Sequence, residues 1–245
     1  MEISLAAEKI GHIGSFPITN SMLLSWIVSI LLIIFVMIAT KKMKLVPSGI
    51  QNFFETIVEV LFNTADGVIE NRNETKKYFP LVATIFLFVV CNNWLGLVPG
   101  VGSIGINEVK EGHNVLVPIF RGGNADLNTT LALAITAVIS VQVFGIAAIG
   151  TIKYAKKFFN FSNPINFFVG FLEIISEFSK MISFSFRLFG NIFAGEILLM
   201  VIAFLVPYIA PLPFFFLELF VGLVQGLVFM MLTLVFIKGA TSEAH

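Results

Sequence analysis

Long runs of apolar residues, separated by short polar segments, dominate this 245-residue chain. A helix needs roughly 20 apolar residues to cross ~30 Å of hydrocarbon, because each residue advances it by about 1.5 Å. The runs therefore predict an all-α, polytopic membrane protein that forms a single membrane domain over residues 1–245. About five membrane helices are expected, over residues 21–40, 79–98, 127–152, 167–205 and 214–237.

Residues 48–70 follow a different pattern, in which apolar and polar positions alternate with helical spacing. Phe53, Ile57 and Leu61 fall on one side of a helix, and Glu55 and Glu59 fall on the other. This pattern predicts an amphipathic helix that lies at the membrane surface. Residues 100–124 are rich in glycine and polar residues, and they predict a loop outside the membrane.

The stretch from residue 165 to residue 206 is long for one membrane crossing. It contains no proline, although Pro164 precedes it and Pro207 follows it. One continuous helix here would be ~60 Å long, about twice the thickness of the hydrocarbon core. The stretch must therefore break into two passes or form one helix that tilts more than usual. Its glycines stand alone and mark no turn, which favours a single, steeply tilted helix.

The composition supports the bilayer as the solvent of this chain. Hydrophobic residues make up 57% of it and charged residues only 12%, whereas a soluble domain carries roughly 25% charged residues. The net charge is zero and no basic block stands out, so no nucleic-acid partner is expected. Cys91 is the only cysteine, which excludes an internal disulfide. The three histidines are scattered over tails and loops, and neither a metal site nor a cofactor is predicted.

The distribution of basic residues predicts how the chain is oriented. With the N-terminus outside and five crossings, most lysines and arginines fall in inner segments, the excess that is typical of cytoplasmic loops. The inner residues are Lys41, Lys42, Lys44, Arg72, Lys76, Lys77, Lys153, Lys156, Lys157 and Lys238. The outer residues are Lys9, Lys110 and Arg121. The first residues lack the pattern of a cleaved signal peptide.

Charged residues inside the expected membrane helices point most directly to function. An arginine at a helix centre costs about 2.5–3.5 kcal/mol on insertion scales, so Arg187 is a candidate functional residue. At about 100° per residue, a polar stripe along this helix stays within about 40° of one line. The stripe consists of Glu173, Ser176, Lys180, Ser183, Arg187 and Asn191, with Glu177 at its edge. Glu196 lies on the opposite side of the helix, ~13.5 Å beyond Arg187.

The last expected helix has a polar face of its own, formed by Glu218, Gly222 and Gln225. In the predicted orientation, acids collect at two levels with Arg187 between them. The inner acids are Glu173 and Glu177, and the outer acids are Glu196 and Glu218. Carboxylates can relay protons, whereas an arginine stays charged. The pattern suggests two proton-conducting half-paths that are separated by a fixed positive charge.

Other interpretations of these residues stay open on the sequence alone. Glu177 and Lys180 could form a structural ion pair, and Glu196 or Glu218 could be an interfacial acid that reaches toward water. The chain could also be a stand-alone secondary transporter, although it lacks the internal repeat with paired, broken helices that marks many of them. A membrane scaffold is a third possibility, but it would leave Arg187 unexplained.

Residues 187–196 read R-L-F-G-N-x-x-A-G-E, and this run resembles the signature helix of the subunit a family of F-type ATP synthases. The similarity extends back through Glu173 and Lys180, and forward to Glu218 and to residues 225–229. It is weaker over residues 93–99 and 125–131. Two positions differ from well-known bacterial members, since Glu218 stands where some carry a histidine and Gly96 where some carry an aspartate.

The resemblance implies a role for each candidate residue. Arg187 is expected to face a carboxylate on a rotating c-ring and to keep two half-channels apart, with Asn191 and Gln225 as its polar neighbours. Glu196 and Glu218 are expected in the outer access path and Glu173 in the inner one. The complete set of expected proton-translocation residues is Arg187, Glu196, Glu218, Asn191, Gln225, Glu173, Glu177 and Lys180.

The resemblance also implies the surroundings of the chain. The last two helices are expected to form a long tilted hairpin around the c-ring. The implied partners are the c-ring, the peripheral-stalk b subunits, the rest of the synthase and the lipid bilayer. The implied location is the bacterial inner membrane, with the N-terminus outside and the C-terminus in the cytoplasm, or an organelle inner membrane. The sequence has no P-loop, so a non-catalytic, proton-conducting subunit is expected.

Overall fold

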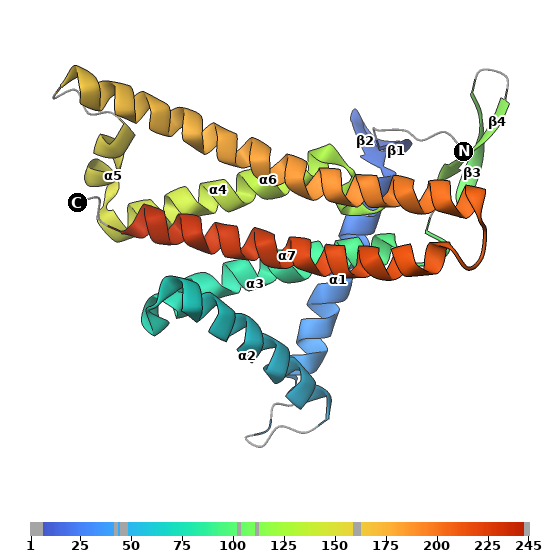
Figure 1. Ribbon diagram of the computed structural model, residues 1–245, viewed down its shortest axis with the longest axis horizontal. Coiled ribbons are helices and arrows are strands. Elements are labelled where there is room, and N and C mark those ends of the chain that lie inside the picture. Colours follow the sequence, from blue (N-terminus) through green and yellow to red (C-terminus); the bar gives the residue numbers. More distant parts are fainter. Residues whose placement is uncertain are drawn as a thin grey trace.

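The computed structural model describes residues 7–41, 44, 49–101, 104–110, 113–158 and 163–242. Within them, five helices are long and apolar enough to cross a membrane, which confirms the predicted fold class. They are α1 (Asn20–Thr40), α3 (Arg72–Gly96), α4 (Leu127–Ile149), α6 (Pro164–Leu205) and α7 (Pro211–Thr241). Figure 1 shows α3, α4, α6 and α7 running roughly along the long axis of the molecule, with α1 set across them.

Helix α6 is continuous over 42 residues, as its lack of internal proline predicted. At about 1.5 Å per residue it is ~63 Å long, whereas the 21 residues of α1 span ~32 Å. Helix α7 returns beside α6 in the opposite direction, so the two form a long hairpin (Figure 1). Because α1 matches the thickness of the hydrocarbon core and α6 is twice as long, α6 has to lie at a steep angle to the bilayer normal.

Shorter helices complete the helical part of the fold. Helix α2 (Ile50–Ile69) is the amphipathic helix expected over residues 48–70, of which residue 48 lies outside the described residues. Its side chains Leu61, Ala65 and Ile69 are buried in a cluster with residues of α3 and α7. Helix α5 (Thr151–Phe158) and the 3₁₀ helix η1 (Gly123–Ala125) were not anticipated.

Two small antiparallel hairpins also differ from the all-helical expectation. Strands β1 (Lys9–Ile13) and β2 (Phe16–Thr19) pair before α1, and the turn between them uses Gly14 at φ 63°. Strands β3 (Gly105–Lys110) and β4 (His113–Pro118) pair within the segment expected to be a loop. The β-branched residues of that segment favour extended backbone. Strands β3 and β4 lie at the end of the molecule near the turn between α6 and α7, whereas β1 and β2 lie at the start of α1 (Figure 1).

Helix boundaries differ from the expected ones where a capping residue, a glycine or a proline sets the end of the helix. Helix α3 begins at Arg72, because the side chain of Asn71 accepts hydrogen bonds from the backbone N–H groups of Asn73 and Glu74 and caps it. Helix α4 ends at Ile149, where Gly150 turns the chain at φ 90°. Helix α7 starts at Pro211, since proline fits the first turn of a helix.

The core lies where α3 and α7 pack against each other and against α4 and α6. Met230 and Leu234 of α7 are fully buried beside Val82 of α3. Gly226 allows this close approach, because a methyl group there would lie 2.6 Å from the side chain of Val90. A second cluster joins all four helices through Ile85, Val89, Ala134, Ala137, Leu188 and Phe229. This packing holds the middle of α6 in a fixed position on α7.

Candidate functional site

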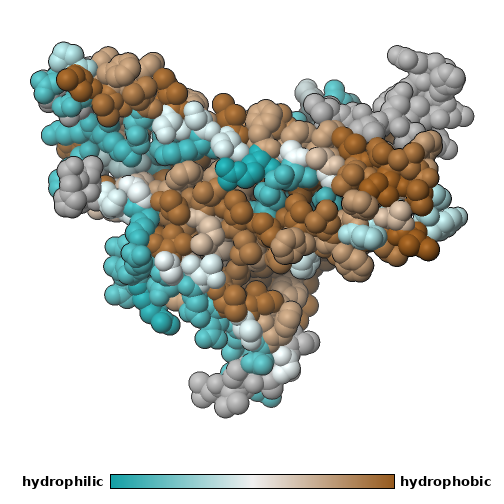
Figure 2. Space-filling view, viewed as in Figure 1, coloured by the Kyte–Doolittle hydropathy of each residue, from teal (hydrophilic) through white to brown (hydrophobic). Residues whose placement is uncertain are grey.

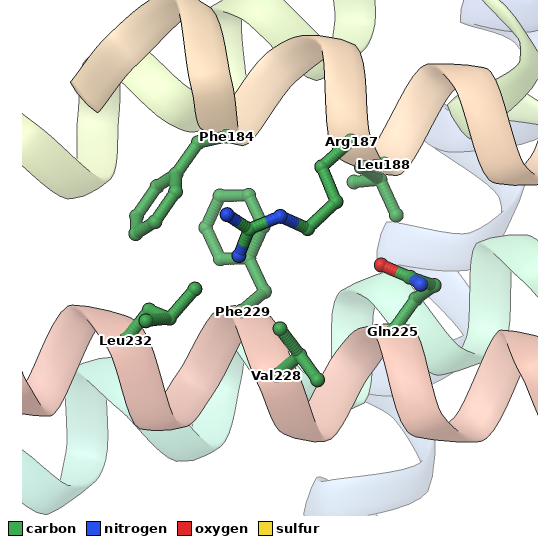
Figure 3. A pocket seen from close by; sticks show the side chains of 7 residues that line it. All are labelled: Phe184, Arg187, Leu188, Gln225, Val228, Phe229 and Leu232. Atoms are coloured by element: carbon green, nitrogen blue, oxygen red, sulfur yellow. The ribbon is translucent and has the colours of Figure 1, made fainter. Parts of the chain in front are cut away.

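Arg187 extends from α6 toward α7 at a shallow pocket between the two helices (Figure 3). The guanidinium lies with Phe184 on one side and Gln225 of α7 on the other. The pocket is lined by Phe184, Arg187, Leu188, Gln225, Val228, Phe229 and Leu232. The fold thus brings Arg187 and Gln225 together at one pocket.

A polar surface surrounds Arg187 on the exposed side of α6. Ser183, Arg187 and Asn191 are all exposed, as their spacing of four residues predicts. Figure 2 shows a hydrophilic patch over the middle of α6, bordered by hydrophobic surface. The guanidinium donates a long hydrogen bond of 3.4 Å to the hydroxyl of Ser183. Among the described residues, Arg187 forms no ion pair.

The two acids expected in the outer path, Glu196 and Glu218, lie where α6 packs on the first turns of α7. Glu218 is only 6% exposed, and its carboxylate lies against Gly195 of α6. A methyl group at Gly195 would overlap that carboxylate, so the glycine provides the space that Glu218 occupies. Glu196 is the next residue of α6, and its side chain is 25% exposed. The structure therefore places both expected outer acids in one small region.

A loop residue that the sequence analysis assigned to the outside enters this region. Arg121, between β4 and η1, places its Nε 3.9 Å from Oε2 of Glu196 and its guanidinium 5.7 Å from the ring centre of Phe193. The next residue, Gly122, lies close to both Glu196 and Gly96 of α3. The one sequence feature that points to a contact between Arg121 and α6 is the Arg-Gly-Gly run at residues 121–123. The same run is equally typical of a surface turn.

A buried group of polar residues connects α3, η1 and α7 one helical turn from Glu218. Asn124 donates a hydrogen bond of 2.7 Å to the side-chain oxygen of Asn93. Asn93 in turn donates to the carbonyl of Gly222, one turn after Glu218. The side-chain oxygen of Asn124 is buried without a hydrogen-bond partner among the described residues. Sequence reasoning did not single out these asparagines, because Asn93 is one of two adjacent asparagines in an apolar run and Asn124 falls in the segment expected to be a loop.

The opposite end of α6 carries a separate ionic cluster. Lys180 donates a hydrogen bond of 2.6 Å to one oxygen of Glu177, and Gln142 of α4 donates one of 2.8 Å to the other. The hydroxyl of Tyr154 on α5 donates to Gln142. The Lys180 ammonium also lies 4.8 Å from the ring centre of Phe236 on α7. The ion pair considered from the sequence is thus present, and it ties four helices together.

Helix α5 contributes a second ion pair to this end. Nζ of Lys157 lies 2.8 Å from Oε1 of Glu173. Tyr154 is buried, and this burial, together with the charges of Glu177 and Glu173, raises its pKa to about 12. Its hydroxyl therefore stays protonated at ordinary pH and acts as a hydrogen-bond donor. Gly145 permits the contact, since a methyl group there would lie 2.5 Å from the tyrosine ring.

The arrangement separates two titratable clusters by one permanent cation. Arg187 lies between Glu177 and Glu196 along α6, at ~15 Å from one and ~13.5 Å from the other along the axis. The sequence-predicted site residues fall into these three groups and do not form one continuous cluster. Among the described residues, no group of three His, Cys, Asp or Glu side chains could hold a metal ion. Carboxylates on both sides of an arginine are suited to proton relay.

Comparisons with known proteins find one consistent set of relatives. The model of the ATP synthase A chain family matches residues 22–238. ATP synthase subunit a from Campylobacter jejuni subsp. jejuni (strain 81-176) is 38% identical over 224 residues, which cover 89% of each chain. The protein of the same name from Trichlorobacter lovleyi is 34% identical, over 99% of this chain and 96% of that one. That of Geotalea uraniireducens is 36% identical, over 90% and 87%.

Proposed function

Because this chain belongs to the ATP synthase A chain family, we propose that it is the proton-conducting stator subunit of an F-type ATP synthase. In this role it provides two offset half-channels that lead to and from a carboxylate on a rotating c-ring. Proton flow through them turns the ring, and the rotation drives ATP synthesis. The chain itself is non-catalytic, and nucleotide chemistry belongs to other subunits.

The exposed position of Arg187 carries this proposal. The guanidinium lies at the middle of a membrane helix, where a charge is costly, and no acid among the described residues neutralises it. A carboxylate from another subunit would remove this cost. If a ring of such carboxylates passed along the polar surface around Arg187, each carboxylate in turn would pair with the guanidinium. Since an arginine does not release its proton, it also blocks direct proton transfer between the two half-channels.

The acids at the two levels supply the half-channels in this proposal. Glu196 and Glu218 serve the outer path, and Glu173 and Glu177 with Lys180 serve the inner one. Asn191 and Gln225 are the polar neighbours of Arg187. The hydrogen bonds of Glu177 to Lys180 and Gln142 support a fixed anion there, and Glu173 is paired with Lys157 of α5.

The setting of the subunit follows from the same proposal. The c-ring lies against the exposed polar face of α6, and the peripheral-stalk b subunits and the rest of the synthase complete the assembly. The chain resides in a bacterial inner membrane, with its N-terminus outside and its C-terminus in the cytoplasm. The basic residues of α5 and the last turn of α7 at one end of the bundle support this orientation.

Replacing Arg187 by lysine tests the proposal. Arg187→Lys keeps the charge but loses the planar guanidinium, and a lysine can release its proton when it is desolvated. Proton-driven ATP synthesis in membrane vesicles is expected to fall at least about 100-fold, as when a charge-stabilising donor is removed from a reaction centre. The matched control is Arg72→Lys at the start of α3, where the arginine lies over the ring of Phe62 away from the site.

The control should synthesise ATP at the rate of the unchanged complex, at equal levels of assembled enzyme. Synthesis by the Arg187→Lys complex that equals the Arg72→Lys control would contradict the assignment of Arg187 as the barrier between the half-channels.

A further inference from the structure

The side chain of Arg121 is packed against α6, beside Glu196. Its side chain is only 13% exposed, although the residue belongs to the connection between β4 and η1. Phe193 and Glu196, one turn apart on α6, contact the guanidinium through a ring face and a carboxylate. A guanidinium that is removed from water in this way needs an anionic partner.

The backbone next to Arg121 is confined as well. A methyl group at Gly122 would lie 2.8 Å from Oε1 of Glu196, and one at Gly96 would lie 2.9 Å from the Cα of Gly122. The loop therefore passes between α3 and α6, and its backbone leaves no room for a side chain at Gly96. This close passage holds the backbone next to Arg121 beside Glu196.

Among the described residues, charged side chains approach Glu196 from a loop and from α7. Arg121 approaches from the loop, and Glu218 approaches from α7, where it lies against Gly195. Two neighbouring carboxylates disfavour being ionised together, and a cation beside one of them relieves that repulsion. Glu218 has no comparable cation among the described residues, so Arg121 acts on the two acids unequally.

We propose that Arg121 is the positioning residue of the outer half-path, which orients the Glu196 carboxylate and sets the outer pH at which this path takes up protons. The inference rests on the proposed function. It differs from the role of Arg187, because Arg121 acts through Glu196 and does not face the exposed surface of α6. The guanidinium beside Glu196 offsets part of the cost of ionising this carboxylate in its partly buried position, so the loss of Arg121 should change how readily the outer path takes up protons.

The test is the dependence of ATP synthesis on outer pH, measured in vesicles that contain the whole complex. Arg121→Gln removes the positive charge and keeps a hydrogen-bond donor. Half-maximal synthesis should then occur at an outer pH higher by about one unit, the size of effect that one neighbouring charge typically has. Arg121→Lys should restore most of the normal profile, because it restores the charge. Arg72→Gln is the matched control and should leave the profile unchanged.

A second variant separates this role from a purely structural one. In a Glu196→Gln background, Arg121→Gln should cause no further shift, because the group on which it acts is gone. If Arg121→Gln alone fails to assemble, the double variant should recover assembly, since no unpaired carboxylate is left. An equal shift with and without Glu196 would overturn the proposal, as would an unchanged profile in Arg121→Gln.

The outcomes also distinguish this inference from the proposed function. If Arg187→Lys abolishes synthesis while Arg121→Gln leaves the pH profile unchanged, the proposed function stands and the role of Arg121 is wrong. If the unchanged complex couples no proton flow to synthesis, both proposals are wrong.

Discussion

Replacing Gly195 by alanine should disrupt the outer acidic site, because the carboxylate of Glu218 occupies the space of the missing side chain. The new methyl group would overlap that carboxylate, so the two groups would have to separate by roughly 1 Å. Glu218 is 6% exposed, so its carboxylate has to move within the packed contact between α6 and α7. The carboxylate turns away from α6, or α7 moves away from α6 at this level, and either response displaces Glu218.

The expected cost follows from this overlap. Overpacking of a tight contact typically costs about 1–3 kcal/mol, and a 1 Å displacement of a reacting group can cost up to ~100-fold in rate. We therefore expect proton-driven ATP synthesis to fall by about tenfold or more at equal levels of assembled complex. Gly239→Ala is the matched control, because Gly239 is also a helical glycine, in α7, and has nothing within 4 Å of its missing side chain.

A double variant identifies the overlap as the cause. In a Glu218→Ala background the methyl group at residue 195 meets no carboxylate, so adding Gly195→Ala should not lower the thermal stability of the complex further. The two substitutions should thus couple by about 1–3 kcal/mol, as neighbouring residues do. If Gly195→Ala behaves like Gly239→Ala in both assembly and synthesis, the contact between Glu218 and α6 is not as the structure has it.

Two further predictions concern the two ends of α6. After Cys91→Ala, the single variant Glu173→Cys should react with a membrane-impermeant thiol reagent from the cytoplasmic side and Glu196→Cys from the opposite side; labelling of both from one side would contradict the offset half-channels. Burial raises the pKa of Tyr154 from its ordinary value of 10.0 to about 12. The folded protein therefore binds the proton of the Tyr154 hydroxyl more tightly than the unfolded chain does, and the free energy of unfolding should fall as pH rises from about 10 to about 12. Tyr154→Phe should remove that step in an unfolding series over this pH range, while losing a hydrogen bond worth about 0.5–1.5 kcal/mol at neutral pH.

The long helices could be predicted because their cause is local. Roughly 20 apolar residues have one stable arrangement in a bilayer, and the absence of proline from α6 was enough to predict its continuity. The ion pair of Glu177 and Lys180 was foreseeable for the same reason, since residues three apart share a helix face. What Gln142 and Tyr154 add to that pair was not foreseeable, because they come from other helices.

The parts that escaped prediction depend on contacts between distant segments. The pairing of β3 with β4 lies within a segment whose glycines and polar residues favoured a loop. The approach of Arg121 to Glu196 joins residues 75 positions apart and depends on how Gly96 and Gly122 let the loop pass α3. A basic residue in an outer segment is most simply a marker of topology, and only the fold gives it a carboxylate to contact.

The acids of α6 differ from its arginine in one consistent respect. Glu173, Glu177 and Glu196 are each within 4.0 Å of a cation, and these cations are Lys157, Lys180 and Arg121. Arg187 has only the Ser183 hydroxyl at 3.4 Å among the described residues. Because a central membrane arginine costs about 2.5–3.5 kcal/mol, a fold that pairs three acids on the same helix would be expected to pair this charge too. Its exposed state, with no acid beside it among the described residues, supports the proposed carboxylate of a partner subunit, which could leave again when that partner moves.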